Sequence, residues 1–267
     1  MSHHCIRLHN LARRFRTPEG QFYTAVQNIT MDVAPGTFVS IVGPSGCGKS
    51  TVLNMVAGLI QPTEGTVEIF DEPLRGTNRR ASYMFQQDAL LPWKTVTENI
   101  ALGLDFRGQN RRKSRELASL WLERVGLSGF GASYPYQLSG GMRKRAAMAQ
   151  CWVVDPDIVL MDEPFGALDV HTRLRMETEI LILWAASRKT VLFVTHDLEE
   201  AISLSDQVVV LSAGPASTIV GTYPVDLPRP RNLIDIKTDP QFTQLYRSIW
   251  SDLRKEVLRS YERNHEA

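Results

Sequence analysis

The sequence predicts an α/β fold in which a mostly parallel sheet carries helices on both faces. One observation is a short apolar run at residues 37–42, followed by a glycine-rich segment and a helical stretch at 52–57 that stops at Gly58. A second is a series of apolar runs and helical stretches that alternate at residues 157–161, 172–186, 190–195, 198–204 and 207–211. Continuous apolar strands separated by helices are typical of parallel sheets buried on both faces.

Two further segments depart from this alternation. Residues 5–35 alternate in polarity as two or three antiparallel strands do, with a turn signal at Thr17-Pro18-Glu19-Gly20. From about residue 88 to 150 helical patterning takes over, at 96–104 and 113–125. In the second of these stretches, one face is predicted to carry Leu117, Leu120, Trp121 and Val125. We therefore expect an N-terminal antiparallel β subdomain and an inserted α-helical subdomain.

These patterns predict a division of the chain into an α/β domain and a tail. The core is expected from residues 1–87 and 151–225, the helical subdomain from about 88 to 150, and the tail from 226 to 267. The tail contains a predicted helix at 242–263, which can serve as a dimer prop, a regulatory element or a packing helix.

Bulk composition narrows the class of protein. The chain has 267 residues and a net charge of +1, which gives no reason to expect nucleic-acid binding through bulk electrostatics. Its three cysteines form no metal-binding spacing, so we expect a reducing, cytosolic environment. We expect no signal peptide and no membrane-spanning segment, because no apolar run approaches the ~18–20 residues that a bilayer requires.

The glycine-rich segment matches the phosphate-loop pattern G-x-x-x-x-G-K-[ST]. Its residues are Gly43, Pro44, Ser45, Gly46, Cys47, Gly48, Lys49, Ser50 and Thr51. A strand precedes it and a helix follows, so backbone N–H groups and a helix N-terminus point at one anion. Lys49 is predicted to reach the β- and γ-phosphates of a nucleotide, and the Ser50 hydroxyl to hold Mg²⁺.

Polar residues close several of the predicted strands. Gln86, Asp162, Glu163 and His196 all lie where a strand ends, as Gly43 does. Ligands of parallel sheets bind at the carboxyl ends of the strands. Asp162 is predicted to hold Mg²⁺ and Glu163 to accept a proton from the attacking water or orient it. Gln86 is predicted to contact the metal or the water, and His196 the γ-phosphate.

A second anion site is predicted at the start of a helix. Ser139 is a good N-cap, and Gly140 and Gly141 allow close approach of a backbone. One nucleotide does not need two phosphate cradles in one subunit. We therefore expect this site to meet the γ-phosphate bound by a second copy, in a head-to-tail dimer with ATP between the subunits.

An aromatic residue of the N-terminal strands is placed to stack on an adenine ring. Phe15 is the first candidate and Tyr23 the second. For each of them, a role as a core aromatic fits the sequence equally well.

In this order, the motifs resemble the nucleotide-binding subunit of an ABC transporter. Leu138-Ser139-Gly140-Gly141 matches the family's signature sequence, Gly166-Ala167-Leu168-Asp169 its D-loop, and His196 its switch histidine. The resemblance covers about residues 5–225. It implies ATP and Mg²⁺ as ligands, ATP hydrolysis, a homodimer around two ATP molecules and a nucleotide contact at Asp169.

Other stretches are similar to the nitrate/sulfonate/taurine importer branch of that family. These are residues 85–93 (FQQDALLPW), 163–169 (EPFGALD) and 226–231 (DLPRPR), together with the tail helix. This resemblance implies uptake of a small, often anionic solute through a separate permease and a solute-binding protein. It places the chain at the cytoplasmic face of the cell membrane. The run 89–93 is equally compatible with a docking surface and with helical-subdomain core.

Some positions depart from the family pattern. Lys144 stands where glutamine is common, Gln150 where arginine is common, and Cys151-Trp152 where small or aliphatic residues are common. These departures loosen the substrate assignment and leave the phosphate contacts intact.

Two other classes of protein fit the sequence less well. Soluble ABC factors carry two cassettes or a long coiled coil, and this sequence has one phosphate loop and no sustained heptads. Glu163 and His196 argue against a module that binds ATP without turnover.

Overall fold

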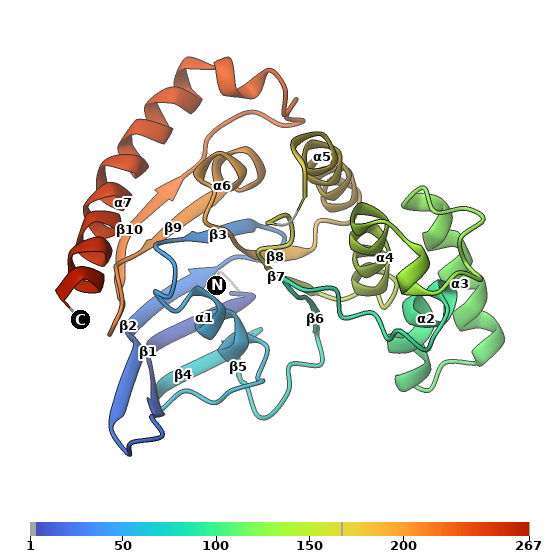
Figure 1. The fold of residues 1–267 in the computed structure, drawn as a ribbon, viewed down its shortest axis with the longest axis horizontal. Coiled ribbons are helices and arrows are strands. Elements are labelled where there is room, and N and C mark those ends of the chain that lie inside the picture. Colours follow the sequence, from blue (N-terminus) through green and yellow to red (C-terminus); the bar gives the residue numbers. More distant parts are fainter. Residues whose placement is uncertain (1–3, 167, 267) are drawn as a thin grey trace. The chain divides into compact units, whose positions relative to one another are not determined.

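The computed structural model describes residues 4–166 and 168–266, which fall into two compact units (Figure 1). The first unit comprises the chain up to Arg79 and from Arg188 onward, and the second comprises Arg80–Ser187. Ala167, within the predicted D-loop, lies outside the described residues, as do residues 1–3 at the start of the predicted core and residue 267 at the end of the tail.

An antiparallel sheet opens the first unit. In spatial order its strands are β2 (Phe22–Val33), β1 (Ile6–Arg16), β4 (Glu64–Ile69) and β5 (Glu72–Pro73). The β1–β2 hairpin turns at the predicted position, where the Thr17 N–H donates to the Gln21 carbonyl at 2.8 Å. The two strands pair as far as this turn and bring Phe15 opposite Tyr23.

The second sheet region of this unit contains three parallel strands. β9 (Gln207–Leu211), β3 (Phe38–Val42) and β8 (Thr190–Val194) lie side by side in that order, and β10 (Ile219–Pro224) pairs antiparallel with β9. Every residue of β3 and β8 is buried, as expected for strands covered on both faces. Ile41 pairs with Val194, so Gly43 and His196 follow strands that end at the same edge.

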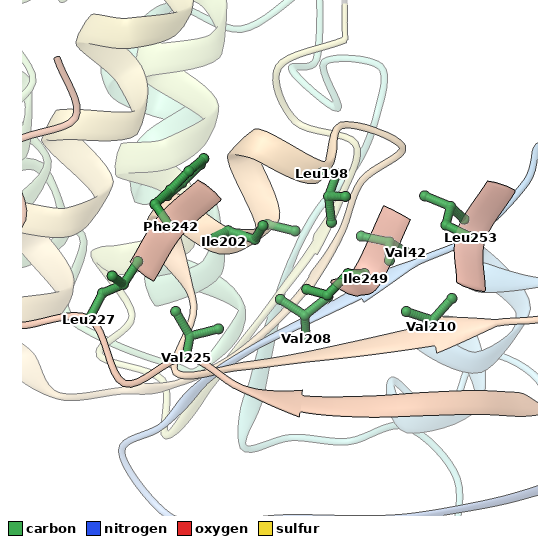
Figure 2. Close-up of a cluster of buried hydrophobic side chains, with 11 residues drawn as sticks. Val42, Leu198, Ile202, Val208, Val210, Val225, Leu227, Phe242, Ile249 and Leu253 are labelled. Atoms are coloured by element: carbon green, nitrogen blue, oxygen red, sulfur yellow. The ribbon is translucent and has the colours of Figure 1, made fainter. Parts of the chain in front are cut away.

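Helices of the first unit follow these strands. They are α1 (Lys49–Val56), α6 (Leu198–Leu204), the 3-10 turn η2 (Ile236–Thr238) and α7 (Pro240–Glu266). The tail packs into the unit, because Phe242, Ile249 and Leu253 of α7 share a buried cluster with residues of β3, α6 and β9 (Figure 2). Of the three roles predicted for the tail, packing is therefore observed.

The second unit has two parallel strands and is otherwise mostly helical. β6 (Ala81–Met84) pairs in parallel with β7 (Ile158–Asp162). Between them along the chain come α2 (Val96–Phe106), α3 (Arg111–Arg124), η1 (Pro135–Gln137) and α4 (Gly140–Trp152), and after β7 comes α5 (Val170–Ser187). The start of α2 is defined by a capping box, in which the Thr95 hydroxyl accepts from the Glu98 N–H and the Glu98 carboxylate accepts from the Thr95 N–H.

The predicted apolar face of α3 is partly wrong. Leu120 is 53% exposed, and the residues that α3 buries are Ser114, Ala118 and Leu122. Small side chains allow two helix backbones to approach closely, so an interface can be built from residues that an apolar pattern passes over.

The run 89–93 contains both a core residue and an exposed one, so the core alternative fails for the run as a whole and the docking surface stays a prediction. Leu90 is 8% exposed and belongs to the core, whereas Trp93 is 70% exposed. Among the described residues, no helix combines the length and apolar character that a membrane span needs. The α/β fold with an antiparallel β-sheet and an inserted helical segment is confirmed.

Candidate functional site

The phosphate loop adopts a conformation that depends on its glycines. Gly46 and Gly48 have φ angles of +75° and +95°, in the left-handed region that L side chains rarely adopt. A Cβ at Gly48 would also lie 2.5 Å from Val26 Cγ1 of β2. Strain therefore disfavours a side chain at Gly46 and at Gly48, and at Gly48 the neighbouring strand leaves no room for one. The loop leads directly into α1, where the Val52 N–H donates to the Gly48 carbonyl at 3.0 Å.

Lys49 is folded back over this loop. Its side chain is buried, with 5% exposure, and its ammonium donates to the carbonyls of Gly43 at 2.9 Å and Pro44 at 3.0 Å. The charge is thus held inside the curve of the loop, where a triphosphate is predicted to lie.

The two aromatic candidates differ in surroundings. The Arg13 guanidinium lies 4.7 Å from the centre of the half-buried Phe15 ring. Tyr23 is 41% exposed, and its hydroxyl lies 3.6 Å from the position that a Cβ of Gly214 would take, beside the backbone of Gly46 and Cys47. Both rings therefore remain candidates for adenine stacking.

His196 follows β8 in the same unit and is exposed. The backbone beside it is anchored at Thr195, whose N–H donates to Ile41 of β3 at 3.2 Å. The Thr195 hydroxyl donates to the buried Glu200 carboxylate at 2.6 Å and accepts from the Asp197 N–H at 3.0 Å. His196 therefore lies in a hydrogen-bonded turn at the edge of the sheet where the phosphate loop also begins.

In the second unit, the structure brings Gln86, Asp162 and Glu163 together at the ends of β6 and β7. The Gln86 amide donates to Glu163 Oε2 at 3.2 Å, and the Tyr83 hydroxyl donates to Asp162 Oδ2 at 3.3 Å. Burial, and then the nearby Asp162 charge, raise the pKa of Tyr83, so this phenol stays a proton donor to the carboxylate. Tyr83 was not predicted, because nothing local distinguishes it from a core aromatic.

Glu163 has an unusual backbone. Its φ angle is +43°, which is uncommon for a residue with a side chain and costs about 1–3 kcal/mol. Strain of this kind persists where the surrounding structure fixes it, often at functional sites.

The predicted Mg²⁺ donors suit this ion in type. Ser50, Gln86 and Asp162 would offer hydroxyl, amide and carboxylate oxygens, the hard ligands that Mg²⁺ prefers. No group of three or more His, Cys, Asp or Glu side chains in the described ranges is arranged to hold a metal. Nucleotide-bound Mg²⁺ does not need one, because phosphates and water fill most of its coordination sphere.

The predicted second anion site is a hollow in the second unit. The Ser139 hydroxyl caps α4 by accepting from the Met142 N–H at 3.3 Å. Ser139, Gly140 and Gly141 line a cavity of 710 Å³, together with Asp169 and the cationic side chains of Arg145 and Arg175. Positive charge beside a helix N-terminus favours an anion.

Asp169 lies at the rim of this hollow. The Thr172 side chain, the Thr172 N–H and the His171 N–H stabilise its ionised form and lower the pKa of its carboxyl. Thr172 itself faces Gly141, since a Cβ on Gly141 would lie 2.8 Å from Thr172 Cγ2. Sequence reasoning missed Thr172, because its place depends on how α5 packs beside α4.

Lys144, a departure from the family pattern, joins the signature helix to the segment that carries Gln86. It is 4% exposed, and its ammonium donates to the carbonyls of Gln86 at 2.5 Å and Phe85 at 3.4 Å. The ammonium also lies 3.3 Å from Asp88 Oδ1, and the Arg143 guanidinium lies 3.1 Å from Asp88 Oδ2. Two consecutive basic residues of α4 therefore hold residues 85–88.

Replacing Lys144 by Met is expected to lower the free energy of unfolding by about 3 kcal/mol, because the partly buried Asp88 carboxylate loses one of its two cationic partners and two carbonyls lose this donor. Lys144→Gln keeps a donor and should lose less than half as much. Urea unfolding of both variants measures this. The exposed Lys113→Met is the control, expected to change stability by less than about 0.5 kcal/mol. If Lys144→Met were as stable as wild type, Lys144 would not be what holds residues 85–88 in place.

Comparison with known proteins agrees with this arrangement. Residues 26–166 match the family model described as ABC transporter. An ABC transporter ATP-binding protein of Methanocaldococcus jannaschii is 42% identical over 96% of this chain and 93% of its own. A taurine import ATP-binding protein of Roseobacter denitrificans is 37% identical, covering 94% of this chain and 96% of its own. A nitrate import ATP-binding protein of Synechococcus elongatus is 39% identical, covering 88% and 86%.

Solved structures extend the likeness to the fold. The dimeric structure of a bacterial ABC transporter cassette has a TM-score of 0.74 and 32% identity, over 84% of this chain and all of that one. A post-hydrolysis structure of the same cassette, bound to ADP and phosphate, has the same TM-score and 31% identity. The phosphate loop, the paired acids, the signature sequence and these similarities lead to one conclusion: the chain belongs to the ABC transporter family, as an ATPase subunit.

Proposed function

We propose that this chain energises the import of a small anionic solute, of the nitrate, sulfonate or taurine type, through a separate membrane permease. The supporting observation is the extent of similarity to import proteins. The taurine import relative of Roseobacter denitrificans aligns with 94% of the chain, well beyond the ATPase motifs that the whole family shares. A solute-binding protein would deliver the solute, and the chain would act at the cytoplasmic face of the membrane.

In the proposed mechanism, Lys49 and the backbone of Gly43–Thr51 hold the triphosphate, and Phe15 or Tyr23 stacks on the adenine. Glu163 accepts the proton of a water whose oxygen attacks the γ-phosphorus, and the bond to the β–γ bridging oxygen breaks to release ADP. His196 donates a hydrogen bond to the γ-phosphate. Ser50, Asp162 and Gln86 would hold Mg²⁺, which would neutralise phosphate charge when bound.

We further propose that two copies of the chain close around two ATP molecules. Ser139, Gly140, Gly141 and Asp169 of one copy would then contact the nucleotide held by the other copy's phosphate loop. The 710 Å³ hollow beside the signature helix, with its cationic lining, supports this proposal. Hydrolysis would reopen the dimer and pass the motion to the permease.

Uptake measurements in the native host test the importer assignment. Deletion of the gene is expected to abolish uptake of labelled taurine or of nitrate, and the wild-type gene to restore it. Lys49→Ala is expected not to restore uptake, because the phosphate cradle loses its buried cation. If the deletion strain takes up nitrate, taurine and other sulfonates at wild-type rates, the anionic-solute assignment is wrong.

A further inference from the structure

The C-terminal helix α7 packs in the same buried cluster as β3, the strand that precedes the phosphate loop. Ile249 and Leu253 of α7 share one buried cluster with Val42, the residue before Gly43, and with Val208 and Val210 of β9 (Figure 2). Both α7 residues are almost fully buried, with 0% and 5% exposure. This apolar contact fixes the position of α7 against β3 and β9.

Two polar residues farther along α7 hold the turn that follows β9. Glu256 is 5% exposed, and its Oε2 accepts from the Ala213 N–H at 2.9 Å. Its other oxygen accepts from Arg259 at 2.5 Å. Two helical turns beyond Glu256, the Arg263 guanidinium donates to the Gly214 carbonyl at 2.5 Å. Consecutive residues of the turn are therefore bonded to one face of the helix.

The same turn touches the phosphate loop. A Cβ on Gly214 would lie 3.3 Å from the Gly46 carbonyl oxygen and 3.6 Å from Cys47 Cα. A Cβ on Gly43 would lie 3.0 Å from the Leu211 carbonyl oxygen. The last residue of β9 thus borders the start of the loop, and the turn after β9 borders its middle.

A strand holds the turn from the other side. The Ala216 N–H donates to the Thr24 carbonyl of β2 at 2.7 Å, and the Gln27 N–H donates to the Ser217 carbonyl at 2.8 Å. Residues 212–218 are consequently held between α7, β2 and the phosphate loop, with little freedom to move independently.

We propose that Glu256 is a positioning residue for nucleotide binding, which acts through residues 212–218 on the backbone of Gly46 and Cys47. A phosphate cradle depends on backbone N–H groups that already point at one place. The buried Glu256 carboxylate holds the turn that supports them. Without this acceptor the Ala213 N–H is buried and unsatisfied, so the turn shifts to find another partner and the support of the loop is lost. Glu256 touches no nucleotide in this proposal.

Nucleotide binding to the full chain tests it, with a fluorescent ATP analogue for Kd and steady-state hydrolysis for KM and kcat. Glu256→Ala is expected to raise Kd and KM about fivefold, the scale of one lost hydrogen bond, and to leave kcat at saturating ATP within about twofold. Glu256→Gln keeps an acceptor for the Ala213 N–H and should bind ATP within about twofold of wild type. Glu262→Ala removes an exposed acid of the same helix and should leave Kd, KM and kcat unchanged.

Three outcomes decide the question. A folded Glu256→Ala protein with wild-type Kd overturns the proposal, even if its Tm is lower, because a purely structural role moves Tm alone. If Glu256→Ala does not fold, Arg263→Ala decides, because it removes only the bond from an exposed side chain to Gly214. A two- to threefold rise in Kd, roughly the effect of one weaker hydrogen bond, supports the proposal, and an unchanged Kd overturns it.

The inference rests on Gly43–Thr51 being the nucleotide cradle, and Lys49→Ala serves as the reference. If Lys49→Ala binds ATP as wild type does, the cradle assignment itself fails. If Lys49→Ala loses ATP and Glu256→Ala does not, only the role of Glu256 fails.

Discussion

Replacing Glu163 by Gln is expected to lower kcat for ATP hydrolysis by about 10²- to 10⁴-fold, the usual scale for a positioned general base. The amide is nearly isosteric and can keep its place beside Gln86, which lies 3.2 Å from the carboxylate. It cannot accept the proton of the attacking water. ATP binding should persist, so the variant is expected to accumulate as an ATP-bound dimer, measured by size-exclusion chromatography with and without ATP.

The matched control for this variant is Glu123→Gln, which neutralises an exposed acid of α3 in the same unit. Its turnover should equal that of wild type. Near-normal hydrolysis by Glu163→Gln would remove Glu163 from the role of base, and the strain at its φ of +43° would then need another explanation.

Replacing Gly141 by Trp is expected to abolish ATP-driven dimer formation while each monomer still binds ATP. A Cβ at this position already lies 2.8 Å from Thr172 Cγ2, so Thr172 must turn aside and the indole is directed into the 710 Å³ hollow. The phosphate loop is in the other unit and is unaffected. Light scattering in the Glu163→Gln background, where the dimer is expected to persist, gives the clearest reading.

Thr178→Trp is the control, because it adds the same bulk to α5 at an exposed residue that does not line the hollow. It should dimerise normally. Dimers of the Gly141→Trp protein in ATP would show that the signature face does not cover a second copy's nucleotide.

Local patterns predicted most of the secondary structure. α6 and β9 have the bounds that the sequence indicated, Leu198–Leu204 and Gln207–Leu211, because short apolar runs between clear turn signals define them. The phosphate loop was equally recognisable, since its spacing is tied to backbone geometry that only glycine tolerates at Gly46 and Gly48.

Features that depend on packing between distant segments were not predictable in this way. The α3 face was misjudged at Leu120 because interfaces between close helices favour small residues such as Ala118. Lys144 was noted only as a departure, and its bonds to Phe85 and Gln86 join residues 58 or 59 positions apart. No periodicity or motif carries such information.

The bonds between Lys49 and the carbonyls of Gly43 and Pro44 restrict which cationic side chain position 49 can carry. A phosphate that approaches this ammonium competes with two acceptors already in place, so recruitment of the ligand is an exchange of partners. A compact ammonium with three donors can rotate between carbonyl and phosphate oxygens within so small a space, whereas a planar guanidinium has a rigid fork and a larger head. The loop is therefore matched to the shape of its cation as well as to its charge, and arginine would not be an equivalent residue at position 49.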